Sequence, residues 1–237
     1  MTVESILQNP GRLLVVLAHP DDEIAIAGWL SRQMGPVAMV WLHSTPVREQ
    51  ESRRAGARIN PSAELIFWQG TDGRILEETS DLQAKLEQLM AEFGPDTVAT
   101  LAYEQGHLDH DATHRMVRSV WAGPVVEFPM YHPYTRRIQT LNEFSDPAGQ
   151  VILPLTETES RLKRDLYRLY PSQTLRRNIL AYQLLRRLQL RPVQLDRREV
   201  LRLAKPYNWT QPNGPEWLVR EVCQSPQWAR WRRAIQA

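Results

Sequence analysis

Residues 13–23 read Leu-Leu-Val-Val-Leu-Ala-His-Pro-Asp-Asp-Glu, so a run of bare aliphatic side chains leads directly into a histidine, a proline and three acids. A short aliphatic run bounded by Gly11 and Pro20 is typical of a strand that is buried on both faces of a parallel sheet. An apolar pattern with helical spacing begins again at Ile24. The polar residues therefore lie at the carboxyl end of a predicted strand, where open α/β sheets bind their ligands.

The polar end of this segment has both a structural and a chemical interpretation. Acids in the first turn of a helix complement its dipole and cap free N–H groups, and Asp21 would serve as such a cap. His19 and Asp22, however, are nitrogen and oxygen donors of the kind that bind Zn²⁺. Asp21 between them would then be free to act as a base. The motif predicts a metal site if a further ligand comes from elsewhere in the chain.

Strand-like and helix-like segments alternate along the first half of the chain. Further strands are predicted at 37–42, 64–68, 97–101 and 124–128, with helices over 23–34, 47–59, 82–93 and from 108 to about 121. This alternation predicts an α/β fold with a Rossmann-like, mostly parallel sheet of strand order 3-2-1-4-5, flanked by helices. In that order the first and fourth strands are neighbours, and their carboxyl ends flank one crevice.

A second polar cluster, His107-Leu108-Asp109-His110, follows the predicted fourth strand and opens a helix. His107 and His110 are three residues apart, so both can point to the same side of a helix. The predicted strand order brings this cluster next to residues 19–22. No local rule requires two distant polar clusters to meet at one crevice, so their meeting is the strongest functional signal in the sequence.

Composition excludes several classes of protein. The net charge of +2, with no recognised binding motif, argues against a nucleic-acid partner, and no Gly-rich phosphate loop follows the first strand. Cys223 is the sole cysteine, which excludes an internal disulfide and a Cys-based zinc site and predicts a reducing, cytoplasmic location. No apolar run is long enough for a transmembrane segment, and no signal-peptide layout is present.

The regular alternation of strand-like and helix-like segments ends near residue 130. We expect residues 1–130 to form the Rossmann-like core and residues 131–237 a smaller α+β extension that packs on it, completes the pocket and folds with it as one unit. Within the extension the sequence predicts a β-hairpin over 136–154, a helix behind a Thr156/Glu159 capping box, a helix from Ser172 to about 190, a strand over 199–203 and a terminal helix that holds Trp228 and Trp231.

The two motifs, Ala18-His19-Pro20-Asp21-Asp22-Glu23 and Gly106-His107-Leu108-Asp109-His110, together resemble those of the PIG-L/LmbE-like family of zinc-dependent N-acetylglucosaminyl deacetylases. The resemblance covers roughly residues 12–130, with Leu108 where the family usually has proline. Weaker similarities are Arg48 with Glu51, Asp72, and Lys163 with Tyr170-Pro171-Ser172-Gln173. The loop at 43–46 differs from the acidic, Gly-rich loop of many members, which leaves the substrate open.

The resemblance implies a metal cofactor, Zn²⁺ with Fe²⁺ as the alternative, held by His19, Asp22 and His110. It further implies that Asp21 is the general base for the hydrolytic water. His107, in protonated form, would donate to the oxyanion and to the departing nitrogen. The reaction would be removal of an acetyl group from an N-acetylated amino sugar or its glycoconjugate, which is a small-molecule partner.

Three further residues have a structural alternative to the role that the resemblance implies. Asp109 would orient a catalytic histidine, or it is a capping acid of its helix. Arg48 and Asp72 would bind the substrate, or they are a surface ion pair and a turn residue. We expect His114 to be a buried structural histidine, and the roles of His43 and His132 stay open.

Two other functions remain open from the residues alone. One is an amidase that acts on a different acyl amide, because loop sequences decide that choice. The other is a catalytically silent sugar- or nucleotide-binding module on the same scaffold, although a silent copy has no need of Asp21 and His107. The sequence leaves the oligomeric state open, an oligomer included.

Overall fold

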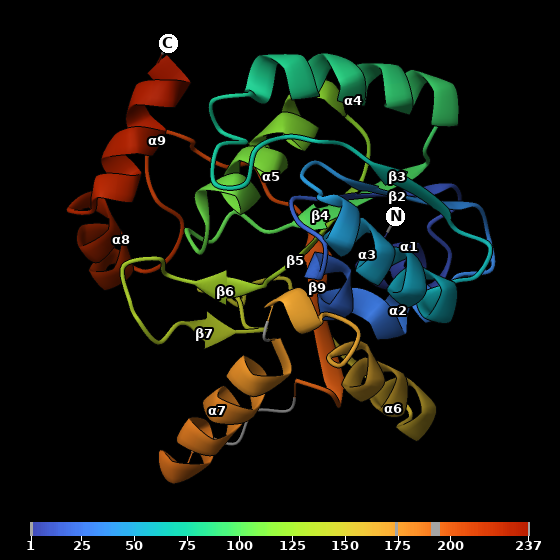
Figure 1. The fold of residues 1–237 in the computed structure, drawn as a ribbon. Helices are drawn as coiled ribbons and strands as arrows, with labels where there is room; N and C mark the ends of the chain where they lie inside the picture. The colour runs from blue at the N-terminus through green and yellow to red at the C-terminus, as the bar shows by residue number, and fades with distance from the viewer. Residues whose placement is uncertain (1, 174, 191–194, 237) are drawn as a thin grey trace.

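A seven-stranded sheet forms the centre of the protein, seen here in a computed structural model that describes residues 2–173, 175–190 and 195–236 (Figure 1). Its strand order is β3-β2-β1-β4-β5-β9-β8, with β9 (Arg198–Leu203) and β8 (Val151–Pro154) at one edge. The parallel strands are β1 (Leu13–Leu17), β2 (Val37–Trp41), β3 (Glu64–Phe67), β4 (Thr97–Leu101) and β5 (Val125–Phe128). The predicted Rossmann-like sheet and its 3-2-1-4-5 order are confirmed.

Helices cover both faces of the sheet, which explains the aliphatic strands. α2 (Ala27–Ser31), after the 3₁₀ segment η1 (Asp22–Ile26), packs with α3 (Pro46–Ile59) on one side, and α4 (Thr79–Phe93) packs with α5 (Leu108–Val120) on the other (Figure 1). Every residue of β1 has no exposed surface. Burial on both faces favours aliphatic side chains at every position of a strand, so the strand shows no polar alternation.

The later half of the chain adds antiparallel strands to this sheet. β9 (Arg198–Leu203) pairs with β5, and β8 (Val151–Pro154) pairs with β9. The predicted hairpin over 136–154 is wrong, because β8 pairs with β9 and the short β7 (Thr140–Leu141) pairs with β6 (Tyr131–His132). The strand predicted at 199–203 is confirmed.

The remaining helices range from a single 3₁₀ turn to 14 residues. They are α1 (Val3–Gln8), which the sequence analysis missed, α6 (Glu157–Leu166), η2 (Pro171–Gln173), α7 (Leu175–Leu188), α8 (Glu216–Cys223) and α9 (Pro226–Gln236). The Thr156/Glu159 capping box of α6 is confirmed. Among the described residues, no helix combines the length and the apolar character needed to cross a membrane. The division of the chain near residue 130 stays a prediction.

A buried charged network joins β9 to the parallel strands. Arg202 of β9 donates to Glu127 of β5 (Nε to Oε1, 2.6 Å), and the Tyr207 hydroxyl donates to the same oxygen at 2.6 Å. Glu104, after β4, lies 3.5 Å from Arg202 and accepts a hydrogen bond from the Ser145 backbone N–H at 2.7 Å. Burial raises the pKa of Glu104 to about 7.

We expect Glu104→Gln to flatten the pH dependence of the free energy of unfolding between about pH 4.5 and 7. The folded pKa is about 7 and the reference value is 4.5, so the folded chain keeps a proton that the unfolded chain releases. The contribution of Glu104 to stability is therefore complete below about pH 4.5 and is lost as the pH rises through 7. At ~1.4 kcal/mol per pKa unit, the change between 4.5 and about 7 amounts to roughly 3 to 4 kcal/mol.

Urea unfolding at a series of pH values measures this effect. Glu87→Gln, which removes an exposed carboxylate from α4, is the matched control and should keep the wild-type slope. Parallel pH profiles for wild type and Glu104→Gln would contradict the prediction.

Candidate functional site

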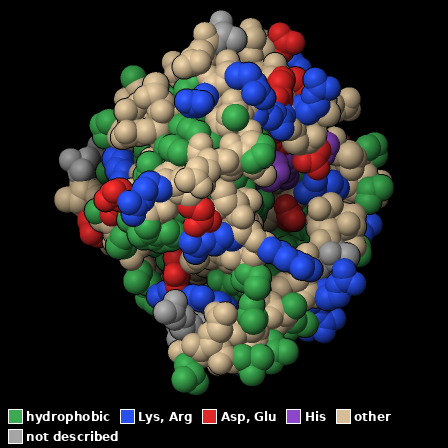
Figure 2. Space-filling model, turned by 90° about the vertical axis from the view of Figure 1, so that its left-hand side faces the viewer, with side chains coloured by type: hydrophobic (Ala, Val, Ile, Leu, Met, Phe, Trp, Pro, Cys, Tyr) green, Lys and Arg blue, Asp and Glu red, His purple; other side chains and the backbone are tan. Residues whose placement is uncertain are grey.

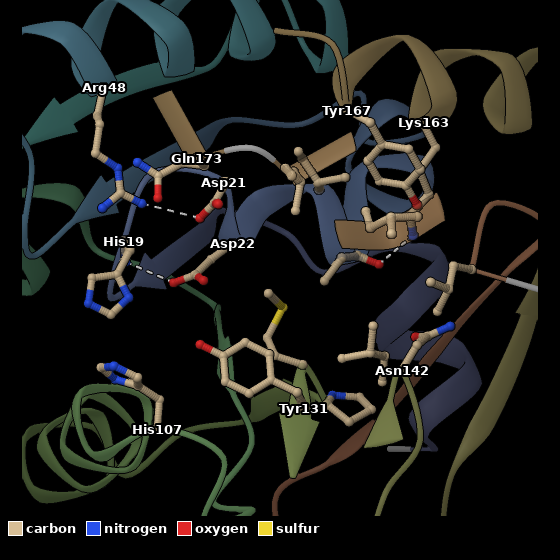
Figure 3. Close-up of a pocket in the computed structure, with 18 of the residues that line it drawn as sticks. His19, Asp21, Asp22, Arg48, His107, Tyr131, Asn142, Lys163, Tyr167 and Gln173 are labelled. Atoms are coloured by element: carbon tan, nitrogen blue, oxygen red, sulfur yellow. Dashed lines mark hydrogen bonds and ion pairs between the residues drawn. The ribbon is translucent and has the colours of Figure 1, made fainter. Parts of the chain in front are cut away.

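The two polar motifs meet at the carboxyl ends of β1 and β4, as the strand order predicts. The ring centroid of His19 lies 5.1 Å from that of His107 and 5.4 Å from that of His110. His19 lies in the loop that leaves β1, and His107 is the N-cap residue of α5. Figure 3 shows His19 and His107 facing one another, with Asp21 and Asp22 beside them.

The donor atoms of this cluster lie close enough to share one ion. One nitrogen from each of His19, His107 and His110 lies within 4.8 Å of the others. Asp22 is also in contact, because its Oδ1 lies 3.4 Å from His110 Nε2 and its Oδ2 accepts a hydrogen bond from the His19 backbone N–H at 2.8 Å. The predicted ligand set and the three-nitrogen cluster therefore share His19 and His110. They differ in the third member, which is Asp22 in the predicted set and His107 in the cluster.

The chemistry of these donors fits a divalent metal. Within the described part of the chain, His110 Nε2 is buried and has no hydrogen-bond partner. A buried imidazole nitrogen without a partner is costly unless something binds it. Two imidazoles with one carboxylate or a third imidazole are donor sets typical of catalytic zinc and of non-haem iron.

The ionisable groups of the cluster shift one another's pKa values in opposite directions. Burial alone would lower the pKa of His19, but its hydrogen bonds to Asp109 and Asp72 raise that pKa to about 10. Burial alone would raise the pKa of Asp22, but the neighbouring His110 lowers it to about 2. Burial, together with the two neighbouring histidines, lowers the pKa of His107 to about 4. This lowered pKa opposes the protonated form of His107 that the resemblance implies, and that form stays a prediction.

Asp21 occupies a strained backbone position and does not cap the helix with its side chain. Its φ is 102°, in the left-handed region that non-glycine residues rarely adopt, and its carboxylate makes no capping hydrogen bond. Burial and the adjacent Asp22 raise its pKa well above the ordinary range for aspartate. Backbone strain of this kind clusters at functional sites.

A hydrogen-bonded brace holds Asp21 in this conformation. The Asp21 backbone N–H donates to Glu23 Oε2 at 3.0 Å, and the same oxygen accepts from Trp41 Nε1 at 3.1 Å. The other oxygen of Glu23 accepts a hydrogen bond from the Tyr170 hydroxyl. The loop that carries Asp21 is therefore tied to a residue far along the chain, and the sequence analysis missed this role of Glu23 because nothing local identifies Tyr170 as its partner.

Asp109 contacts His19 and does not cap its own helix. Its Oδ2 lies 3.0 Å from His19 Nε2 and accepts from the Gly73 backbone N–H at 2.7 Å, and its Oδ1 accepts from the Ile75 N–H at 3.1 Å. The structure thus brings Asp109 to one of the predicted ligands and to the loop after β3. The N-cap hydrogen bond of α5 comes instead from His107, whose Nδ1 accepts from the Asp109 N–H at 3.2 Å.

The two residues predicted to bind substrate also lie at this site. Arg48 donates to the Pro20 carbonyl at 2.6 Å and to Asp21 Oδ1 at 3.4 Å. Asp72 lies 3.6 Å from Arg48 Nη1 and 3.3 Å from His19 Nε2, and its side chain is 56 % exposed. Arg48 and Asp72 therefore contact residues of the polar cluster, and they do not form a separate ion pair elsewhere on the surface.

The other histidines have separate positions. His43 donates from Nδ1 to the Gly70 carbonyl at 2.6 Å, and its ring centroid lies 5.9 Å from that of His19. His114 has no exposed surface and donates to the Leu101 carbonyl at 2.7 Å, which agrees with a structural role. His132 is buried outside the residues that line the cavity.

A cavity of about 320 Å³ opens beside the cluster. Figure 2 shows histidine side chains inside a hollow of the surface, with basic and acidic side chains around it. The cavity is lined by His19, Asp21, Asp22, Arg48, Asp72 and His107 at one end and by residues of β7, α6 and α7 beyond them. The fold and this site define a Rossmann-like protein with a carboxylate–imidazole centre at the point where its sheet reverses winding.

Residues 14–121 match the family model PIG-L, described as GlcNAc-PI de-N-acetylase. The match includes both polar motifs, and it confirms the resemblance to this family that the motifs predict. No curated protein matches the chain. The family match supports a deacetylase kind of function.

Solved structures show the same fold at low sequence identity. The conserved protein TT1542 from Thermus thermophilus is 20% identical, with 83% of this chain and 96% of that chain covered and a TM-score of 0.59. The A40926 pseudoaglycone deacetylase Dbv21 is 17% identical (84% and 99% covered, TM-score 0.59). The zinc-inhibited form of teicoplanin deacetylase Orf2 is 14% identical (81% and 97% covered, TM-score 0.57).

Proposed function

We propose that this protein is a metal-dependent hydrolase that removes the acetyl group from an N-acetylated amino sugar or its glycoconjugate. The observation that carries the proposal is the carboxylate of Asp21, which sits on a strained backbone and contacts Arg48, directly before Asp22, which contacts His19 and His110. The description of the matched family as a de-N-acetylase supports the reaction. The names of two proteins of the same fold, an A40926 pseudoaglycone deacetylase and a teicoplanin deacetylase, support a glycoconjugate substrate.

His19, Asp22 and His110 would hold the metal, with Zn²⁺ or Fe²⁺ as the ion. The chemistry supplied there would be polarisation of the amide carbonyl and acidification of the attacking water. Asp109 would hold the His19 ring in orientation through its 3.0 Å contact and its two bonds to backbone N–H groups.

Asp21 and His107 would move the protons of the reaction. Asp21 takes a proton from the attacking water, and its raised pKa makes it a stronger base than an ordinary aspartate. His107, across the site from Asp21, would in its protonated form donate a hydrogen bond to the carbonyl oxygen as that atom gains negative charge, and would then pass its proton to the departing amine and become neutral. Arg48 and Asp72, both at the cavity wall, would hold sugar hydroxyls.

Acetate release from the methyl glycoside of N-acetylglucosamine tests the proposal. We expect the purified protein to release acetate, to lose this activity after chelation and to regain it with Zn²⁺ or Fe²⁺. The methyl glycoside of N-acetylgalactosamine, measured in parallel, reports how strictly the sugar is recognised. A metal-loaded protein that releases no acetate from either sugar would reject the proposal in favour of a silent binding module.

A further inference from the structure

Beyond the polar cluster, the cavity continues into a part whose walls are hydrocarbon. We name this part the apolar arm and define it by Ile24, Met130, Leu141, Leu175, Ile179 and Leu195, all of which line the cavity. We infer that the substrate carries an apolar group, alkyl or aryl, next to its amino sugar, and that the apolar arm binds this group. The inference rests on the proposed function, because the arm belongs to the same cavity.

The part of the cavity next to α6 and to Asn142, which follows Leu141 of β7, lies at the end away from the histidines. In Figure 3, His19, Asp21 and His107 lie at one end, Tyr131 lies between, and Tyr167, Lys163 and Asn142 lie at the other end. A group attached to a sugar at the cluster would therefore extend past Tyr131 into the arm.

Two polar side chains at this end of the cavity, those of Lys163 and Asn142, are paired within the protein. Lys163 Nζ donates to Glu199 Oε1 at 2.9 Å and to the Ala25 carbonyl at 2.7 Å, and its side chain is 3 % exposed. Asn142 Nδ2 donates to the Arg198 carbonyl at 3.3 Å. What the arm offers a ligand is mainly hydrocarbon surface, where a sugar hydroxyl would lose its hydrogen bonds to water and an alkyl or aryl group would not.

α7 supplies the outer wall of the arm. Leu175 and Ile179 are four residues apart, so they share the helix face that borders the cavity, while Leu184 of the same helix is 60% exposed. The hydroxyl of Tyr182, also on α7, accepts a hydrogen bond from the Leu141 backbone N–H at 3.2 Å, which ties the helix to β7. The arm is thus assembled largely from residues after position 130 that carry no chemistry of their own.

The apolar group has two chemical sources that the cavity does not separate. It is part of the aglycone on the sugar, or it is part of an acyl chain longer than acetyl on the amine. In both cases the recognised chemistry is hydrocarbon, and the volume of about 320 Å³ is at the lower end for a small-molecule site.

Three substrates test the inference: the methyl and octyl glycosides of N-acetylglucosamine and the methyl glycoside of N-octanoylglucosamine, each below its micelle concentration. Two of these compounds, the octyl glycoside and the N-octanoyl amide, carry an eight-carbon chain. We expect kcat/KM for one of them to exceed that for the methyl glycoside of N-acetylglucosamine by ~100-fold, since each buried methylene adds to binding. Preference for the octyl glycoside would identify the apolar group as part of the aglycone, and preference for the N-octanoyl amide would identify it as part of the acyl chain. Equal kcat/KM for all three would overturn the inference.

Ile179→Asp places a charge in the apolar arm. It should lower the ratio of kcat/KM for the preferred eight-carbon compound to kcat/KM for the methyl N-acetyl compound by ~10-fold or more. Leu184→Asp, on the exposed face of the same helix, is the matched control and should keep the wild-type ratio. If no substrate is turned over, the proposed function fails, and calorimetric binding of the octyl and methyl glycosides then decides the inference alone. Tighter octyl binding that Ile179→Asp weakens supports the apolar arm, whereas equal affinities overturn it.

Discussion

Asp21→Asn is expected to lower kcat for deacetylation by ~100-fold or more and to leave the fold and the bound metal in place. Asparagine keeps the size of aspartate and tolerates a positive φ, so the strained backbone at 102° is preserved. What is removed is the ability to take a proton from water. The brace from Glu23 acts on the backbone N–H of residue 21 and is unaffected by the change of side chain.

The measurement combines acetate release, metal content per chain and circular dichroism. Asp165→Asn is the matched control, because Asp165 is on α6, outside the cavity, and its side chain is 38 % exposed. A variant that retains metal, fold and full activity would show that Asp21 is not the base. A variant that loses the metal would show that Asp21 acts as a ligand.

His110→Ala is expected to reduce the metal content from about one ion per chain to nearly none. Replacing an outer-shell partner typically costs 10–100-fold in metal affinity, and loss of a direct ligand should exceed that range. Asp22→Asn should behave in the same way if Asp22 is the third ligand. His107→Gln should then keep the metal while kcat falls by ~100-fold, because an oxyanion donor has been removed.

The comparison of Asp22→Asn with His107→Gln distinguishes the two sets of donors. His107→Gln losing the metal while Asp22→Asn keeps it would assign the three-nitrogen cluster of His19, His107 and His110 as the ligand set. His43→Gln removes a histidine of the same site that belongs to neither set, and it should retain the metal. Elemental analysis after dialysis against trace Zn²⁺ measures all of these variants.

The site depends on segments that lie far from its motifs. Tyr170 donates to Glu23, whose other oxygen holds the backbone of Asp21. Two residues further on, the Ser172 backbone N–H donates to Glu51 of α3 at 3.1 Å. The residues proposed to carry the chemistry thus come from the first half of the chain, and some of those that hold them in place come from the second half.

The sequence by itself determined the parallel part of the sheet and the place of the site. Strands buried on both faces are aliphatic throughout, so β1 and its neighbours could be recognised locally. The reversal of strand order then required residues 19–22 and 107–110 to meet. Both inferences rest on short-range patterns and on general rules of chain topology.

The tertiary structure alone decided how the later half of the chain is arranged. The pairing of β8 with β9 contradicts the predicted hairpin, because antiparallel pairing of half-buried strands depends on which partner the rest of the fold presents. The left-handed φ of Asp21, the contacts of Asp109 with residues 73 and 75, and the apolar arm likewise arise from contacts between distant segments. Such contacts leave no periodic or local signature, since each depends on the three-dimensional position of its partner.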